Sequence, residues 1–268
     1  MPHAVPGRLM ITCFRTAFLW ITFAIFWAFP AQADDWPIMG VARLDILPGY
    51  AADGSHMAAA HIVMKPGWKT YWRSPGGNGI PPRFSWDGSR NLRGVAFHWP
   101  NPEVYWENGM RTIGYRSDLV LPLELFPQRP GQAIRLRGSV AFGICEEVCL
   151  PVTAAFDATL GGASHISARA VRAALSDGPR VLKEGLTCTI TPAGDGGLRI
   201  EAKARVPGLT QAQFAVVEAK RTDVWIEQFP SAIEGGALTA RATVYPLSSG
   251  PLVIDRAGMR VTILGGDR

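Results

Sequence analysis

The 268-residue sequence lacks the short motifs that identify most hydrolases, nucleotide-binding proteins and zinc enzymes. It contains no Ser-His-Asp spacing, nucleophile elbow, phosphate-binding loop or His-Glu zinc motif, so we expect no cofactor and no resident metal. Charged residues make up only 18%, and the lysines and arginines behind the net charge of +5 are scattered. Because nucleic-acid binders carry basic clusters, this scatter argues against a nucleic-acid partner.

Long apolar runs are also absent, except near the N-terminus. There Arg8 and Arg15 precede an uncharged run over residues 17–29, and an Ala-Gln-Ala motif ends at Ala33. This pattern is typical of a secretory signal peptide that is cleaved after Ala33. The run is shorter than the roughly 20 residues that a membrane-spanning helix needs, so an uncleaved anchor is the weaker alternative. We expect an exported mature chain without a membrane span, in a compartment where disulfides persist.

The composition favours a turn-rich β protein. Hydrophobic residues amount to 47%, enough for a sizeable core, and the 29 glycines and 21 prolines are many for a helical bundle. Apolar runs of strand length recur between glycine and proline clusters. The predicted strands span residues 41–47, 58–64, 94–99, 119–126, 133–142, 152–160, 186–191, 198–205, 224–229, 238–245 and 253–264.

One segment has helical spacing instead. Residues 164–176 begin with a potential N-cap, Ser164, and end before an Asp-Gly-Pro stop. The apolar positions of this segment are Ile166, Ala170, Val171, Ala174 and Leu175. The fold class predicted is all-β, with two immunoglobulin-like β-sandwich domains joined by a short helix. Its predicted divisions are a signal peptide (1–33), a first β domain (34–162), a helical linker (163–179) and a second β domain (180–268).

The most informative feature is a closely spaced cysteine pair, Cys145 and Cys149. Four steps of extended strand span about 13 Å, whereas a disulfide needs Cα atoms about 4.4–6.8 Å apart, so a bridge requires a turn between the two cysteines. Gly143 and Pro151 bracket such a turn. A bridge over so short a loop would contribute roughly 2 kcal/mol, which favours redox use but leaves a structural bridge open.

Two carboxylates and a third cysteine refine this picture. Glu146 and Glu147 lie between the paired cysteines and disfavour a thiolate, which argues against a strong oxidant and for a carrier that reacts when a partner docks. Cys188 alternates with Leu186 and Ile190 and is predicted to be a core residue, although an intermolecular bridge stays possible.

Other constellations are weaker. His56, Met57, His61 and Met64 offer copper ligands, but strand alternation splits them between two faces. The cysteine pair with an outside histidine could bind a soft metal. Glu103 and Glu107 could form a hydrolytic carboxylate pair, but we expect them to lie on the solvated face of a loop. Tryptophans of the first half could bind a glycan if exposed; they are Trp68, Trp72, Trp86, Trp99 and Trp106, of which Trp86 and Trp99 are predicted to be buried.

Three separated motifs resemble the N-terminal periplasmic domain of the DsbD thiol:disulfide interchange proteins, in particular the ScsB-like, copper-suppression-type members. They are KPGWKTYW at 65–72, GYRSDLVLP at 114–122 and GICEEVCLP at 143–151. The resemblance covers about residues 36–162. It implies an immunoglobulin-like sandwich in the periplasm that shuttles electrons, in the chemistry that serves cytochrome c biogenesis and copper tolerance.

The resemblance also implies roles for individual residues. Cys149 would attack the partner's disulfide, and Cys145 would resolve the mixed disulfide. A cap loop would cover the pair from residues 106–115, with Trp106 as the candidate aromatic. The aromatic after Lys-Pro-Gly falls at Tyr71, with Trp68 close by. The partners implied are a thioredoxin-fold periplasmic oxidoreductase and a membrane electron carrier.

The sequence departs from the family pattern in two respects. Only three residues separate the cysteines, and no membrane domain follows before Arg268, so we expect the electron donor to be a separate protein. The alternative function is a non-catalytic periplasmic binding or assembly module, for protein, copper or glycan, whose disulfide is structural. Glu146 and Glu147 border the pair under either reading.

Overall fold

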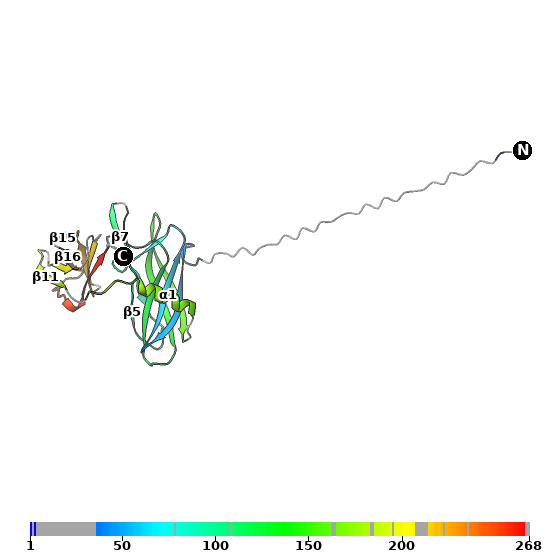
Figure 1. Cartoon of the computed structure of the whole chain (residues 1–268), viewed down its shortest axis with the longest axis horizontal. Coiled ribbons are helices and arrows are strands. Elements are labelled where there is room, and N and C mark those ends of the chain that lie inside the picture. Colours follow the sequence, from blue (N-terminus) through cyan, green and yellow to red (C-terminus); the bar gives the residue numbers. More distant parts are fainter. Residues whose placement is uncertain are drawn as a thin grey trace. The chain divides into compact units, whose positions relative to one another are not determined.

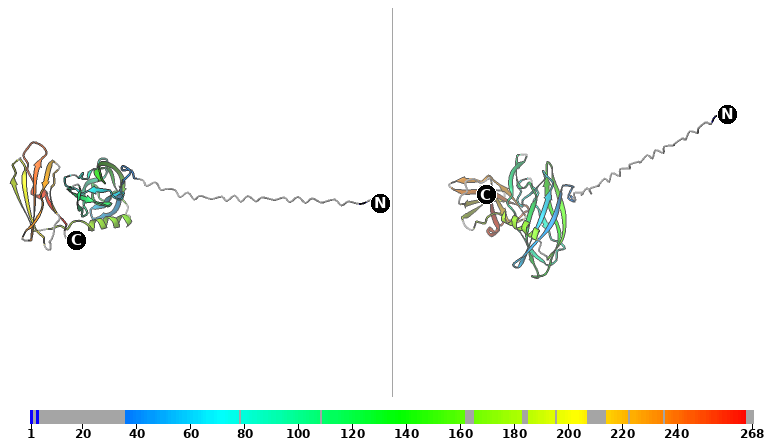
Figure 2. Two further views of the ribbon diagram at one scale, coloured as in Figure 1. Left: turned by 90° about the horizontal axis from the view of Figure 1, so that it is seen from above. Right: turned by 45° about the vertical axis from the view of Figure 1, so that its right-hand side comes forward.

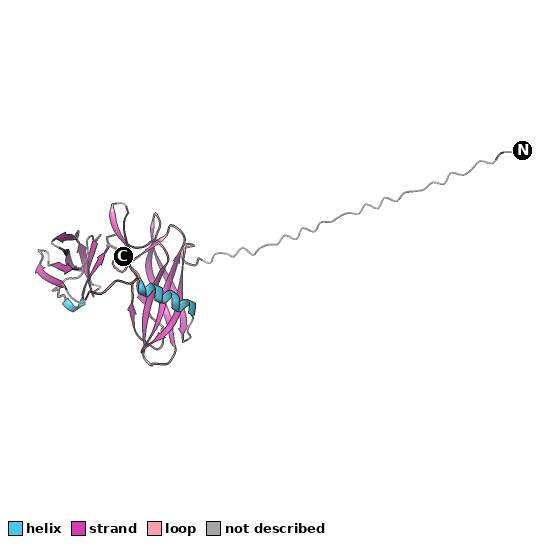
Figure 3. Cartoon of the chain, viewed as in Figure 1, coloured by secondary structure: helices cyan, strands magenta, loops and turns pink. Residues whose placement is uncertain are grey.

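The computed structural model describes residues 36–265 apart from 78, 108, 162–164, 183–184, 195, 207–213, 222 and 235, together with residues 1 and 3. The predicted signal peptide, apart from residues 1 and 3, and the predicted N-cap Ser164 lie outside the described residues. Residues 35–268 form one compact unit. Strands dominate it, which confirms the prediction of an all-β chain with immunoglobulin-like sandwiches (Figure 3). No helix in the described part of the chain is long and apolar enough to cross a membrane.

The first sandwich consists of two facing antiparallel sheets, with strand orders β1-β2-β8-β5 and β10-β9-β3-β7-β6, and with β4 added beside β9. Its strands are coloured from blue to green in Figure 1, where β5 and β7 are labelled. Its strands are β1 (Ala42–Ala52), β2 (Ser55–Met64), β3 (Lys69–Tyr71), β4 (Arg83–Ser85), β5 (Leu92–Phe97), β6 (Glu103–Glu107), β7 (Met110–Tyr115), β8 (Leu119–Pro127), β9 (Ile134–Cys145) and β10 (Cys149–Leu160).

Period-2 alternation explains these strands. In β10, buried and exposed positions alternate along most of the strand, because only one face meets the core. The central strands β8 and β9 bury larger apolar side chains between the sheets, and Leu121, Leu123 and Phe142 are at most 1% exposed. Because apolar burial stabilises by about 25 cal/mol per Å², this layer holds the two sheets together.

The helix α1 (His165–Ser176) covers the outer face of the sheet that contains β1, β2 and β8 (Figure 2). Val171 is fully buried there against Met57 and Ala59. Ile166, the first apolar position of the predicted helix, is 86% exposed, whereas Ala168 is buried three positions before Val171.

The second sandwich comprises a sheet of order β11-β12-β16-β14, with β15 beside β16, and a ribbon formed by β13 and β17. Its elements are β11 (Leu186–Pro192), β12 (Leu198–Arg205), β13 (Phe214–Ala219), β14 (Val224–Gln228), β15 (Ala232–Glu234), β16 (Ala237–Pro246), a 3-10 turn η1 (Arg256–Gly258) and β17 (Met259–Leu264). The strand predicted over 253–264 is therefore shorter, because the Asp255 side chain caps η1 by accepting from the Ala257 backbone N–H.

The strand β13 is buried on both faces. Phe214 and Val216 belong to the core of the first sandwich, whereas Ala215 and Val217 belong to the core of the second. Alternation along one strand thus divides its side chains between two cores. The domain boundaries at 162/163 and 179/180 stay a prediction.

The packing of α1 yields a test with a matched control. Replacing the buried Val171 with Asp should cost at least about 3 kcal/mol, because an uncompensated charge would be buried against the sheet. Replacing the exposed Ile166 with Asp should change stability by about 0.5 kcal/mol or less. Thermal unfolding of both variants measures the difference, and equal Tm values would contradict the packing described for α1.

Candidate functional site

The two paired cysteines close one end of the β9–β10 hairpin. Cys145 is the last residue of β9 and Cys149 the first of β10, and they face each other in the ladder with Cα atoms 4.2 Å apart. Their sulfur atoms are joined in a disulfide. The predicted turn between them is present, and Gly143 and Pro151, which bracket it, are paired with each other in the ladder. Cys145 is only 1% exposed, whereas Cys149 is exposed, so the two residues of the bridge differ in their access to solvent.

The side chain that meets the disulfide is Tyr71 of β3, a short strand inserted between β9 and β7. Its hydroxyl oxygen lies 2.6 Å from Cys145 Sγ and 2.9 Å from Cys149 Sγ. The ring is almost fully buried. Burial, and secondly the charge of Glu107, raise the pKa of the Tyr71 phenol above its ordinary value. The phenol therefore stays protonated at neutral pH and can donate its hydrogen to a sulfur atom.

Two glycines make room for this arrangement. A Cβ on Gly143 would stand 2.8 Å from carbons of the Tyr71 ring, and a Cβ on Gly114 would stand 2.3 Å from the Thr70 carbonyl oxygen and 3.1 Å from the Tyr105 hydroxyl. The Thr70 hydroxyl also donates to the Gly143 carbonyl at 2.8 Å. Glycine is thus required where the ring crosses β9 and where β3 approaches β7.

The β6–β7 hairpin borders the same face. Residues 106–115, predicted as a cap loop, are mostly strand, and so is the segment with Glu103 and Glu107 that was predicted as a solvated loop. Glu107 forms an ion pair with Lys69, whose Cα pairs with Cys145 in the ladder. Tyr105 is buried beside them, and burial, followed by the charge of Glu107, strongly raises its pKa.

Trp106 points the other way. Alternation along β6 places Trp106 on the face opposite to Tyr105 and Glu107, and its side chain is 67% exposed. Its ring centroid lies 5.8 Å from the Arg111 guanidinium, on the residue paired with it in β7. The cap role of Trp106 stays a prediction, and the hairpin residues on the disulfide side are Tyr105 and Glu107.

The remaining predicted site residues lie around the turn. Glu146 and Glu147 are exposed between the cysteines, and Glu146 lies against Gly67, where an added Cβ would stand 3.1 Å from Glu146 Oε1. Trp68 packs, partly buried, against the core of the first sandwich. The structure therefore brings Tyr71 and the two glutamates to the disulfide, while Trp68 serves the core.

Sequence reasoning missed Lys69, Tyr105 and Glu107 as neighbours of the pair. Lys69 could have been found, because it lies two positions before Tyr71 in the same motif and therefore shares its face. Glu107 could not, because its place beside Lys69 depends on the pairing of three strands.

The histidines considered as copper ligands lie apart and contact other groups, as strand alternation predicts. His56 contacts the Pro48 carbonyl at 2.5 Å, and His61 lies 3.8 Å from Asp118 with its pKa lowered by burial. No cluster of three or more His, Cys, Asp or Glu side chains forms within the described ranges. Cys188 packs half-buried against the second core, and burial raises its pKa, which makes it a poor nucleophile. Trp99 is buried and Trp86 half-buried.

The glycine cradle under Tyr71 can be tested with a glycine control. Replacing Gly143 with Ala should displace the Tyr71 ring, cost about 1–3 kcal/mol and speed reduction of the disulfide by a small dithiol. Replacing Gly77 with Ala should change neither quantity, because among the described residues beyond its chain neighbours no atom lies within 4 Å of its Cβ position. Stopped-flow reduction and thermal unfolding measure both effects. An unchanged reduction rate in the Gly143 variant would show that the ring does not shield the sulfur atoms.

Comparison with known proteins agrees with this geometry. Residues 43–161 match the family model described as thiol:disulfide interchange protein DsbD, N-terminal. Among solved structures, the N-terminal periplasmic domain of ScsB from Proteus mirabilis aligns with a TM-score of 0.54 and 18% identity, over 85% of this chain and 94% of that one. No curated protein sequence matches. The matched span contains β3, the β6–β7 hairpin and both paired cysteines, and residues 43–161 of this chain belong to the DsbD N-terminal family.

Proposed function

We propose that the protein is a periplasmic thiol–disulfide exchange protein that passes electrons through Cys145 and Cys149. The observation that carries the proposal is the asymmetry of the bridge, since Cys149 is exposed while Cys145 is buried beneath the Tyr71 hydroxyl. A staple needs no such difference, whereas an exchange protein needs one sulfur that a partner can reach and one that waits behind it. Membership of the DsbD N-terminal family supports the same chemistry.

The exchange runs in two steps. In the reduced protein, the Cys149 thiolate attacks one sulfur of the partner's disulfide and forms a mixed disulfide, and the partner's other sulfur leaves as a thiolate that takes a proton. The Cys145 thiolate then attacks Cys149 Sγ, breaks the mixed disulfide and releases the partner's second sulfur. The partner's disulfide is reduced to a dithiol, and the Cys145–Cys149 dithiol is oxidised to the disulfide by loss of two electrons and two protons.

The surrounding groups fit these steps. The protonated Tyr71 hydroxyl lies within hydrogen-bond distance of both sulfur atoms, so it can stabilise the thiolate that leaves when the bridge opens. Glu146 and Glu147 oppose a thiolate at the exposed sulfur until a partner docks. The partner we propose is a thioredoxin-fold oxidoreductase of the periplasm, and a separate membrane electron carrier returns the Cys145–Cys149 pair to the dithiol.

Single-cysteine variants test the order of attack. Replacing Cys145 with Ser leaves the exposed Cys149 thiol and should trap a mixed disulfide with a thioredoxin-fold partner. Replacing Cys149 with Ser leaves only the buried Cys145 and should trap little. Non-reducing electrophoresis with mass spectrometry of the adduct measures the trapped fraction. Equal trapping by the two variants, or none by either, would sink the proposed exchange function.

A structural disulfide would behave differently on reduction. A bridge that closes so short a loop contributes roughly 2 kcal/mol, so reduction of an exchange protein should lower Tm by roughly 4–8 °C. Collapse of the fold after reduction would favour the alternative of a binding or assembly module held by a structural bridge.

The glutamates generate a separate kinetic expectation. Replacing both Glu146 and Glu147 with Gln should raise the alkylation rate of the reduced Cys149 thiol at pH 7 by up to about tenfold, since one pKa unit changes the thiolate fraction by that factor. The control replaces the exposed Glu227 of the second sandwich with Gln and should leave the rate unchanged. A wild-type alkylation rate in the double variant would show that the two carboxylates do not control the reactivity of the thiol.

A further inference from the structure

We propose that the β13–β17 ribbon positions the disulfide site from behind, with Arg111 as the positioning residue that connects Phe214 to the β6–β7 hairpin. This inference rests on the proposed function, because it assigns to the second sandwich control over access to the Cys145–Cys149 pair. It follows from which side chains occupy the two faces of β3, β6 and β7.

The front face of these strands carries the site. Tyr71 lies opposite Gly114 in the ladder, and Tyr105 and Glu107 share that face by alternation along β6. The back face carries Trp72, Ile113 and Arg111, of which Trp72 and Ile113 are 1% exposed in the first core. Any element that presses on the back face therefore fixes the front-face side chains as well.

Phe214 of β13 presses on that face. Its ring is 2% exposed, and the Arg111 guanidinium carbon lies 3.2 Å from the centroid of the ring. The same guanidinium lies 5.8 Å from the centroid of Trp106 on the neighbouring strand. Arg111 thus links Phe214 to the outermost strand of the sheet, and its partial burial strengthens a cation–π contact. In the described part of the chain, β6 pairs with β7 alone, so this link adds to a weakly held edge.

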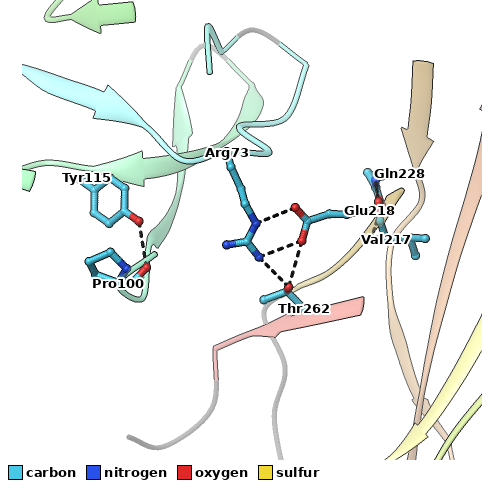
Figure 4. Close-up of polar contacts among 7 residues, drawn as sticks. All are labelled: Arg73, Pro100, Tyr115, Val217, Glu218, Gln228 and Thr262. Atoms are coloured by element: carbon cyan, nitrogen blue, oxygen red, sulfur yellow. Dashed lines mark hydrogen bonds and ion pairs between the residues drawn. The ribbon is translucent and has the colours of Figure 1, made fainter. Parts of the chain in front are cut away.

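A second contact fixes the segment that follows Tyr71. The Arg73 guanidinium donates to both carboxylate oxygens of Glu218, at 2.8 and 3.0 Å, and to the Thr262 hydroxyl at 3.2 Å (Figure 4). The Thr262 hydroxyl also donates to Glu218 at 3.1 Å. The Arg73 and Glu218 side chains are only 16% and 17% exposed, so this bidentate pair is better shielded than a surface salt bridge.

The two contacts act on connected segments. The backbone N–H of Trp72 donates to the Ile113 carbonyl, and the N–H of Ile113 donates to the Pro75 carbonyl, at 3.1 and 3.0 Å. The segment around Arg73 and the strand with Arg111 are thereby joined to each other. The ribbon holds both from behind, while on the other side Tyr71 contacts the disulfide and Glu107 pairs with Lys69.

Breaking the Arg111 link should loosen the hairpin and open the site. In the reduced full-length mature chain, Arg111→Ala and Phe214→Leu should each speed alkylation of the paired thiols by iodoacetamide by about 2- to 30-fold, the range that a cation–π contact spans. Leucine keeps apolar volume in the core at 214 and removes only the ring. Arg111→Lys should give an intermediate rate, because an ammonium keeps the charge and loses the planar stacking.

Controls separate positioning from general loosening. Arg172→Ala removes a cation–π contact between α1 and Tyr50 of β1, and Phe84→Leu changes an aromatic residue of β4; the paired thiols of both variants should be alkylated at the wild-type rate. In the Arg111→Ala background, Phe214→Leu should add no further acceleration, because both changes remove one link. The inference would be overturned if the accelerations of Arg111→Ala and Phe214→Leu add up in the double variant. It would also be overturned if Phe84→Leu speeds alkylation to the same extent.

The measurements distinguish failure of the positioning role from failure of the proposed exchange function. Wild-type alkylation rates in the Arg111→Ala and Phe214→Leu variants would end the positioning role, even if Cys145→Ser still traps a partner. Conversely, equal trapping by the two single-cysteine variants would end the exchange function and leave the access measurements standing as a property of the fold.

Discussion

The contact between the Tyr71 hydroxyl and the two sulfur atoms restricts which strands and residues can surround it. A phenol can reach the end of the β9–β10 hairpin only if a strand enters beside β9, and β3 does so with three residues. The ring must then cross β9, which requires Gly143, and the entry of β3 beside β7 requires Gly114. One polar contact with the bridge thus accounts for a short strand and two glycines.

Burial differs between the two cysteines. Cys145 is covered by Tyr71 and by its place inside the ladder, whereas Cys149 begins the edge strand β10 beside an exposed turn with two glutamates. Desolvation and neighbouring negative charge both oppose a thiolate. The environment therefore disfavours spontaneous reaction of the pair with small oxidants.

The long strands and the cysteine pair could be predicted from the sequence, because alternation and spacing are local signals. The front of the site could be predicted only in part. Tyr71 follows from its motif, but Glu107 reaches Lys69 through strand pairings that no local pattern encodes. Trp106 is next to Glu107 in sequence and on the opposite face in structure, so closeness along the chain is a poor guide within a strand. The strand β13 escaped prediction because its apolar run, buried on both faces, has no alternation to reveal it.

Because β13 is buried on both faces, the core of the first sandwich includes residues of the second. The family match ends at residue 161, yet Phe214, Val216 and Leu264 complete the core of the first sandwich. Each fully buried apolar side chain contributes about 1.5–3 kcal/mol relative to exposure, so the back of β3 and β7 depends on residues that lie far beyond the matched segment. The strands that carry Tyr71 and the hairpin are therefore packed against residues of the second sandwich on one side, and on the other side Tyr71 meets the disulfide. The side chains around the bridge are thus held by a core to which both sandwiches contribute.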